Sequence, residues 1–288
     1  MSDIITLRTP RGLFVSDHPL VMGIYNATPD SFYTYSRQMS LSDADVERRL
    51  ISMEEDGADI VDIGGQSTRP GAKCVSAEEE WNRIETPLRI ARKTMRAALI
   101  SVDTFHAEVA RRAAGEGADI INDISGGEYD KDMFDTIARL SLPYIMMHMR
   151  GTPQDMSQHT SYPSGVTAEV IRELSIKIRD LRLAGVADII VDPGIGFAKT
   201  PEQNYQLISN LKVIADSLEA PVLVGLSRKS LITKLLEITT EEALPATVAL
   251  NTQAILNGAS IIRVHDVKEG WQSVRLASLL AEASEPSL

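Results

Sequence analysis

The sequence predicts a single α/β domain folded as a (β/α)₈ TIM barrel, with a short N-terminal hairpin before the first barrel strand. Eight short apolar runs rich in valine and isoleucine recur along the chain, helical patterns separate them, and no linker interrupts them. Runs that are apolar throughout are typical of parallel strands buried on both faces. Eight such units in 288 residues fit a closed barrel. The alternative is a doubly wound open sheet, which would need no eighth strand.

Each predicted element has its own signal in the sequence. Residues 1–20 contain the turn Pro10-Arg11-Gly12 and are expected to form the hairpin, which leaves residues 21–285 for the barrel. The predicted strands are Val21–Ala27, Asp59–Gly64, Leu99–Asp103, Asp119–Ile124, Tyr144–His148, Asp188–Asp192, Val222–Leu226 and Ser260–His265.

Capping patterns predict where several of the helices begin and end. Ser76-Ala77-Glu78-Glu79 is a capping-box pattern that opens a helix reaching about Ala97. Thr200-Pro201-Glu202-Gln203 combines a capping threonine, a proline at the first helical position and a glutamine three residues after the cap. A third helix, predicted over Leu41–Asp56, ends at Gly57, a residue type that commonly terminates helices.

Composition excludes several classes of function. The 29 basic and 40 acidic side chains give a net charge of −11, which argues against broad binding of nucleic acid or anionic membranes. The single cysteine, Cys74, excludes an intrachain disulfide and fits a reducing compartment. No signal peptide is recognisable, and no apolar run approaches the length of a membrane span. We therefore expect a cytoplasmic protein that binds neither nucleic acid nor membrane.

Polar side chains follow all eight apolar runs, at the ends where barrels of this class carry their chemistry. The residues are Asn26, 64–70, Asp103, Asn122 and Asp123, His148, Asp192, 227–230 and 263–266. Asp103, Asn122 and Asp192 suit a flat nitrogenous ring that offers N–H donors. A phosphorylated or carboxylated group would suit the cationic set Arg69, Lys229, Arg263 and His265.

Structural interpretations compete at some of these positions. Asp103 could instead cap a helix over Ala107–Glu116, and Asp123 is better explained by a structural role. His148 is either a pocket residue or a core histidine that has its partners. Met146, Met147 and Met149 would form pocket wall or core. The zinc motif His-Glu-x-x-His, the P-loop and the esterase motif Gly-x-Ser-x-Gly are absent from the sequence.

Two long motifs resemble the signatures of the dihydropteroate synthase family, whose members are pterin-binding TIM barrels. They are Met22-Gly23-Ile24-Tyr25-Asn26-Ala27-Thr28-Pro29-Asp30-Ser31-Phe32 and Asp62-Ile63-Gly64-Gly65-Gln66-Ser67-Thr68-Arg69-Pro70-Gly71-Ala72. Shorter matches follow in the family's order, at 101–103, 121–123, 147–149, 192–197, 227–230 and 263–265. The resemblance covers about residues 20 to 270.

The resemblance implies an enzyme of folate biosynthesis, a pterinylmethyl transferase that is a target of sulfonamides. It would join 6-hydroxymethyl-7,8-dihydropterin diphosphate to p-aminobenzoate and release pyrophosphate, with Mg²⁺ as cofactor and a homodimer as the assembly. The matched motifs imply that the pterin is contacted by Asp103, Asn122, Met147, Asp192 and Lys229, and the diphosphate by Asn26, Thr68, Arg263 and His265. They imply that p-aminobenzoate is contacted by Thr68, Arg69, Pro70, Phe197 and Ser230, and that Asn26 contacts the metal. The resemblance implies catalytic roles for Asp103, Lys229, Arg263 and His265.

The chain departs from the family pattern in two places. Residues 33–38 lack the acidic residue and the glycines that usually follow Phe32, and Gln66 stands where glutamate is common. Two rival functions remain open. One is a methyltetrahydrofolate methyltransferase, which passes its methyl group to a corrinoid protein. The corrinoid-binding motif Asp-x-His-x-x-Gly is absent from this sequence. The other is a non-catalytic paralogue that binds and sequesters pterin.

Overall fold

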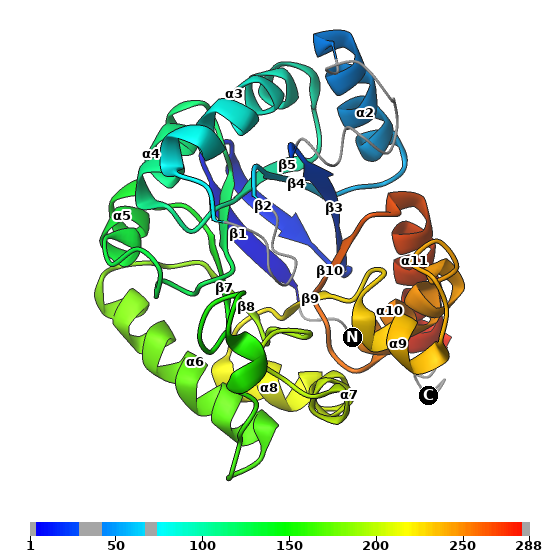
Figure 1. Cartoon of the computed structure of the whole chain (residues 1–288). Helices are drawn as coiled ribbons and strands as arrows, with labels where there is room; N and C mark the ends of the chain where they lie inside the picture. The colour runs from blue at the N-terminus through cyan, green and yellow to red at the C-terminus, as the bar shows by residue number, and fades with distance from the viewer. Residues whose placement is uncertain (1–3, 29–41, 67–73, 284–288) are drawn as a thin grey trace.

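The computed structural model describes residues 4–28, 42–66 and 74–283, and its central feature is a barrel of eight parallel strands (Figure 1). The strands are β3 (Leu20–Asn26), β4 (Ile60–Gly64), β5 (Leu99–Asp103), β6 (Ile120–Asp123), β7 (Tyr144–Met147), β8 (Ile189–Asp192), β9 (Leu223–Gly225) and β10 (Ile261–Val264). Their order is β8-β7-β6-β5-β4-β3-β10-β9, and a bridge between Val191 and Val222 joins the two ends. The predicted barrel is therefore confirmed, and the open-sheet alternative is wrong.

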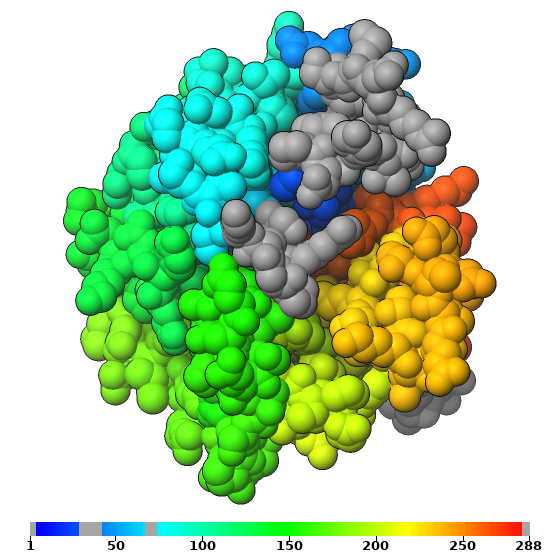
Figure 2. Space-filling view, viewed as in Figure 1, coloured from blue at the N-terminus to red at the C-terminus, as the bar shows by residue number. Residues whose placement is uncertain are grey.

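Helices surround the barrel in sequence order, as the colour sequence around the axis shows in Figure 2. They are α2 (Asp43–Glu55), α3 (Ala77–Thr94), α4 (Ala107–Gly115), α5 (Met133–Leu140), α6 (Val166–Leu183), α7 (Pro201–Ser209), α8 (Leu211–Leu218), α9 (Ser230–Leu236), α10 (Leu244–Leu256) and α11 (Val267–Ala283), with a 3₁₀ turn at Met156–Gln158. No helix within the described ranges is long and apolar enough to cross a membrane.

The predicted caps explain where two of these helices begin. The Ser76 side chain accepts a hydrogen bond from the backbone N–H of Glu79 at the start of α3. At α7, Thr200 and Gln203 form both hydrogen bonds of a capping box, and Pro201 occupies the first helical position. These local signals are independent of tertiary packing, which is why the sequence alone places the two helix starts correctly.

The N-terminal hairpin closes one end of the barrel. Strands β1 (Ile5–Thr9) and β2 (Gly12–Ser16) pair antiparallel, as predicted, although β3 begins at Leu20, one residue inside the predicted extension. Ile5 and Leu7 are almost fully buried against side chains from all eight barrel strands. These side chains are Leu20, Met22, Ile60, Leu99, Ile120, Ile145, Ile190, Leu223 and Ile261. The amino-terminal end of the barrel is therefore an apolar core.

Candidate active site

Side chains that point into the middle of the barrel are polar, in contrast to the apolar layer below them. Asp62 lies on β4, two residues beyond Ile60 of the apolar layer, and is fully buried. The Arg263 guanidinium from β10 lies between two carboxylates, with Nε 2.7 Å from Asp62 Oδ2 and Nη2 2.7 Å from Asp103 Oδ2. Asn122 of β6 donates from Nδ2 to the same Asp62 oxygen at 3.0 Å. We call these four residues the barrel-floor cluster.

Charge in the barrel-floor cluster is strongly affected by burial. Burial raises the pKa of Asp103 to about 7, against the attraction of Arg263, which favours the ionised form. Two further buried oxygens, Asp62 Oδ1 and Ser101 Oγ, have no hydrogen-bond partner in the described part of the chain. Buried acceptors without a partner are costly. A flat ring that offers N–H groups would supply the missing donors.

Asp192 and Lys229 form a second group of polar side chains, next to the barrel-floor cluster. Asp192 ends β8 and accepts a hydrogen bond from the Gly194 backbone N–H at 2.7 Å, and burial raises the pKa of its carboxyl group. Lys229 Nζ donates to the Ile195 carbonyl at 2.6 Å and lies 4.8 Å from the centre of the Phe197 ring. Burial lowers the pKa of Lys229 to about 8, although Asp192 favours its charged form.

An apolar cluster lines the space next to these groups. Met147 is almost fully buried and packs with Phe105, Ile124, Met149, Met156, Phe197 and Ala198. This cluster is separate from the main core of the barrel and from the apolar layer at its closed end. Met147 therefore belongs to an apolar cluster beside Lys229, in agreement with the prediction that it forms pocket wall or core.

The predicted diphosphate residues lie nearer to the open rim. Asn26 ends β3 and is half-buried, whereas His265 follows β10 and is exposed, with Nδ1 3.0 Å from Ser227 Oγ. Ser230 begins α9 and is exposed. The predicted contacts Thr68, Arg69 and Pro70 lie outside the described residues, as do residues 33–38.

The structure decides between the interpretations left open for three residues. The helix-cap explanation of Asp103 is wrong, because α4 is preceded by His106 and the Asp103 carboxylate binds Arg263. Asp123 is structural, since it accepts hydrogen bonds from the backbone of Ser125 at 2.7 Å and from the Tyr144 hydroxyl at 2.6 Å.

The third residue, His148, is a buried histidine with partners on both ring nitrogens. Its Nε2 lies 3.0 Å from Glu173 Oε2, and Lys199 Nζ lies 3.1 Å from its Nδ1. Burial and the neighbouring Lys199 lower the pKa of His148 to about 3, so the ring is neutral at pH 7.

Two residues that shape the site, Asp62 and Lys199, are not among the residues predicted for it. Asp62 belongs to the second long motif, but the motif does not show that this carboxylate binds both Arg263 and Asn122. A carboxylate inside an otherwise apolar strand is a usable signal, because it needs a buried partner. Lys199 gave no such signal, since two of its acceptors are backbone carbonyls.

No three or more His, Cys, Asp or Glu side chains are grouped for metal binding within residues 4–28, 42–66 and 74–283. Asn26 offers one neutral oxygen at the rim. Mg²⁺ commonly binds through one or two protein ligands together with substrate phosphates and water. The residues present therefore fit a magnesium ion carried mainly by a diphosphate, and they do not form a preformed metal cage.

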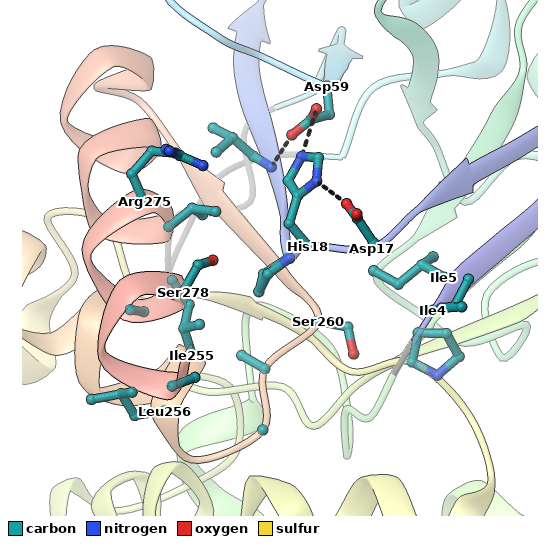
Figure 3. A pocket seen from close by; sticks show the side chains of 18 of the residues that line it. Ile4, Ile5, Asp17, His18, Asp59, Ile255, Leu256, Ser260, Arg275 and Ser278 are labelled. Atoms are coloured by element: carbon teal, nitrogen blue, oxygen red, sulfur yellow. Dashed lines mark hydrogen bonds and ion pairs between the residues drawn. The ribbon is translucent and has the colours of Figure 1, made fainter. Parts of the chain in front are cut away.

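A cavity of about 1610 Å³ is at the other end of the barrel (Figure 3). It lies between the hairpin and helices α8, α10 and α11, where His18 Nδ1 is 3.1 Å from Asp17 and Nε2 is 3.8 Å from Asp59. None of the predicted site residues lines this cavity. We therefore locate the candidate active site by its buried polar groups.

Comparisons with known proteins show which family the chain belongs to. Residues 22–265 match the family model described as pterin binding enzyme. The dihydropteroate synthase of Escherichia coli is 42% identical over 93% of this chain and 94% of its own length. The chain spans about half the length of plant bifunctional folate synthesis proteins that it matches, such as the mitochondrial protein of Pisum sativum, with 40% identity over 94% of this chain and 55% of the relative.

Solved structures show the same architecture. The Yersinia pestis dihydropteroate synthase, solved as a sulfonamide drug complex, superposes with a TM-score of 0.88 at 35% identity, covering 96% of this chain and all of that one. The Xanthomonas albilineans dihydropteroate synthase with 4-aminobenzoic acid gives a TM-score of 0.86 at 35% identity, covering 99% of this chain and all of the other.

Proposed function

Because this chain belongs to the dihydropteroate synthase family of pterin-binding enzymes, we propose that it condenses 6-hydroxymethyl-7,8-dihydropterin diphosphate with p-aminobenzoate. The products are 7,8-dihydropteroate and pyrophosphate, and sulfonamides compete with p-aminobenzoate. One observation carries the proposal: the barrel-floor cluster and Asp192 gather buried carboxylate and amide groups, among them Asp62 Oδ1, which has no hydrogen-bond partner in the described residues, at the end of the barrel where this fold carries its chemistry.

The barrel-floor cluster binds the pterin ring in this proposal. Asp103, Asn122 and Asp192 offer oxygens to the ring N–H and amino groups, and Lys229 offers a donor. Arg263 holds Asp62 and Asp103 apart and keeps them oriented before the ring arrives. A preorganised site of this kind saves the entropy of ordering the side chains on binding.

The reaction breaks the bond between the pterin methylene carbon and the diphosphate oxygen, and it forms a bond from that carbon to the amine nitrogen. The diphosphate leaves with the bonding electron pair, and the amine then loses one proton. In their ionised form, the carboxylates of Asp103 and Asp192 favour positive charge on the ring while the diphosphate departs. Donors aimed at developing negative charge contribute roughly 3–4 kcal/mol each in mutational cases. His265 and Arg263 fill that role here.

Magnesium belongs to the proposal as well. Bound to the diphosphate with Asn26 as a protein ligand, Mg²⁺ would neutralise charge on the leaving group. We expect removal of the metal by a chelator to suppress turnover and added magnesium to restore it. Asn26→Leu should raise the magnesium concentration needed for half-maximal rate.

The assembly is proposed as a homodimer, in line with the family resemblance. The structure contains a small apolar groove between helices α7, α9 and α10, lined by residues that include Tyr205, Ile232 and Leu250. Light scattering of the purified chain measures the oligomeric state directly.

The experiment that tests the function follows pyrophosphate and dihydropteroate together. The purified chain receives the pterin diphosphate and magnesium, with and without p-aminobenzoate. Pyrophosphate release matched one-to-one by dihydropteroate supports the synthase. Tight pterin binding without condensation would contradict it and favour a sequestering paralogue. In single turnover, we expect the rate of pyrophosphate release not to depend on p-aminobenzoate concentration, because the diphosphate leaves first.

A further inference from the structure

A second lysine, Lys199, belongs to the segment that connects β8 to α7, which we call the β8–α7 loop (residues 193–200). Its Nζ lies 3.0 Å from the Gly194 carbonyl, 2.9 Å from the Phe197 carbonyl and 3.1 Å from His148 Nδ1. Burial lowers the pKa of Lys199 to about 7, and its protonated form, an ammonium group, has three N–H donors and no acceptor. All three donors of Lys199 therefore have a partner, and two of those partners belong to the β8–α7 loop.

His148 is held in the orientation that this contact needs. Its Nε2 lies 3.0 Å from Glu173 of α6, and a carboxylate only accepts hydrogen bonds, so the ring proton is on Nε2 and Nδ1 accepts from Lys199. Glu173 in turn accepts from Arg150 Nε at 3.1 Å, and Arg150 Nη2 also donates to Glu169 at 2.8 Å. A continuous chain of charge-assisted hydrogen bonds thus connects α6 to the loop.

The β8–α7 loop needs such support because of its backbone. Ala198 has φ of +50°, a conformation that is costly for a residue with a side chain. The Tyr162 hydroxyl donates to the Ala198 carbonyl at 3.0 Å. Lys229 donates to the Ile195 carbonyl. Together with the two bonds from Lys199, hydrogen bonds to four of its carbonyls therefore hold the loop that carries Phe197.

We propose that Lys199, oriented by His148, is a positioning residue that fixes Phe197 as the wall of the p-aminobenzoate subsite. The inference rests on the proposed function for the identity of the substrate. Lys199 binds the Phe197 carbonyl directly, whereas Asp192 ends β8 and is connected to Lys199 one step further away, through Gly194, which donates to Asp192 and accepts from Lys199. Loss of Lys199 should therefore disturb the p-aminobenzoate side more than the pterin side.

The test is Lys199→Met, which keeps the length of the side chain and removes its donors. We expect the KM for p-aminobenzoate to rise about tenfold, the cost of one charge-assisted hydrogen bond. The KM for the pterin diphosphate should change less than about twofold, well under the cost of one such bond. Lys212→Met is the matched control, because the Lys212 side chain is 73% exposed and pairs with Asp216 one helical turn away. It should leave both constants unchanged.

A second measurement does not depend on activity. Hydrogen exchange of the amides in the β8–α7 loop should become faster in Lys199→Met, while exchange in the barrel strands stays as in the wild type. Tyr162→Phe removes one hydroxyl that also holds the loop, with almost no change in volume. It provides a milder variant, expected to raise the KM for p-aminobenzoate about threefold, below the cost of a charge-assisted bond.

The outcomes distinguish a failure of the positioning role of Lys199 from a failure of the proposed function. A selective rise in the KM for p-aminobenzoate together with faster loop exchange supports the positioning role. Unchanged loop exchange overturns it, and so does an equal rise in both KM values. If the wild-type chain catalyses no condensation, the proposed function fails, and the exchange experiment alone decides whether Lys199 holds the loop.

Discussion

Replacing Asp103 with asparagine measures the stability that the protein gives up to keep a carboxylate in the barrel-floor cluster. Asp103 is 8% exposed, and burial raises its pKa from 3.8 to about 7 while Arg263 acts in the opposite direction. Asparagine has nearly the same shape and cannot ionise. The difference between wild type and variant therefore isolates the free energy of that ionisation.

The sign of the effect follows from proton linkage. With the higher pKa in the folded state, the folded protein binds more protons at Asp103 than the unfolded chain between pH 3.8 and about 7. The free energy of unfolding therefore falls as the pH rises through that window. From about pH 5 to about pH 7.5, the wild type should lose roughly 2–3 kcal/mol relative to Asp103→Asn.

The assay is guanidinium unfolding of both proteins at three pH values, followed by tryptophan fluorescence and circular dichroism. Constant effects of the substitution, such as a weaker bond to Arg263, shift every point equally and leave the slope unaffected. Asp135→Asn is the control, since the Asp135 side chain on α5 is 74% exposed. A difference between wild type and Asp103→Asn that stays constant with pH would refute the reasoning.

Three further predictions concern the pocket wall, the loop backbone and the closed end. Lys229→Met should lower kcat/KM about 100-fold, the scale of one transition-state donor. It should also remove a decline in the wild-type rate as pH rises through about 8, where the ammonium loses its proton. Gly194→Ala would bring a Cβ within 1.9 Å of the His148 carbonyl oxygen, so the unfolding free energy should fall by about 3 kcal/mol. Gly165→Ala meets no neighbour and should cost about 1 kcal/mol from its positive φ alone. Leu7→Ala should cost about 3 kcal/mol in denaturant unfolding, because Leu7 is 1% exposed.

The barrel was predictable because its strands are buried on both faces, which makes each one a compact apolar run. Leu99–Asp103 was predicted with the same bounds as β5, and each of the other strands differs by one residue at one or both ends. Polar residues directly after those runs marked the open end, and three of them, Asp103, Asn122 and Asp192, do face the interior of the barrel.

Contacts that depend on side-chain reach were harder to predict. Arg263 is predicted as a diphosphate contact, and that role stays a prediction, but the sequence does not show that its guanidinium lies between Asp62 and Asp103. Spacing along the chain does not show how far a long side chain extends across a barrel. Lys199 was missed for a related reason, because two backbone carbonyls are among its partners and every residue has a carbonyl.

The hairpin closes the amino-terminal end of the barrel, so the barrel has one open end. This closure sets the order in which ligands can bind. Ile5 and Leu7 seal the bottom, so the described residues leave the barrel-floor cluster accessible from the rim alone. A molecule bound at the floor must enter before one bound near Phe197 and can leave only after it. Sequential kinetics, with the deeper substrate first, thus follow from the seal at the opposite end of the barrel.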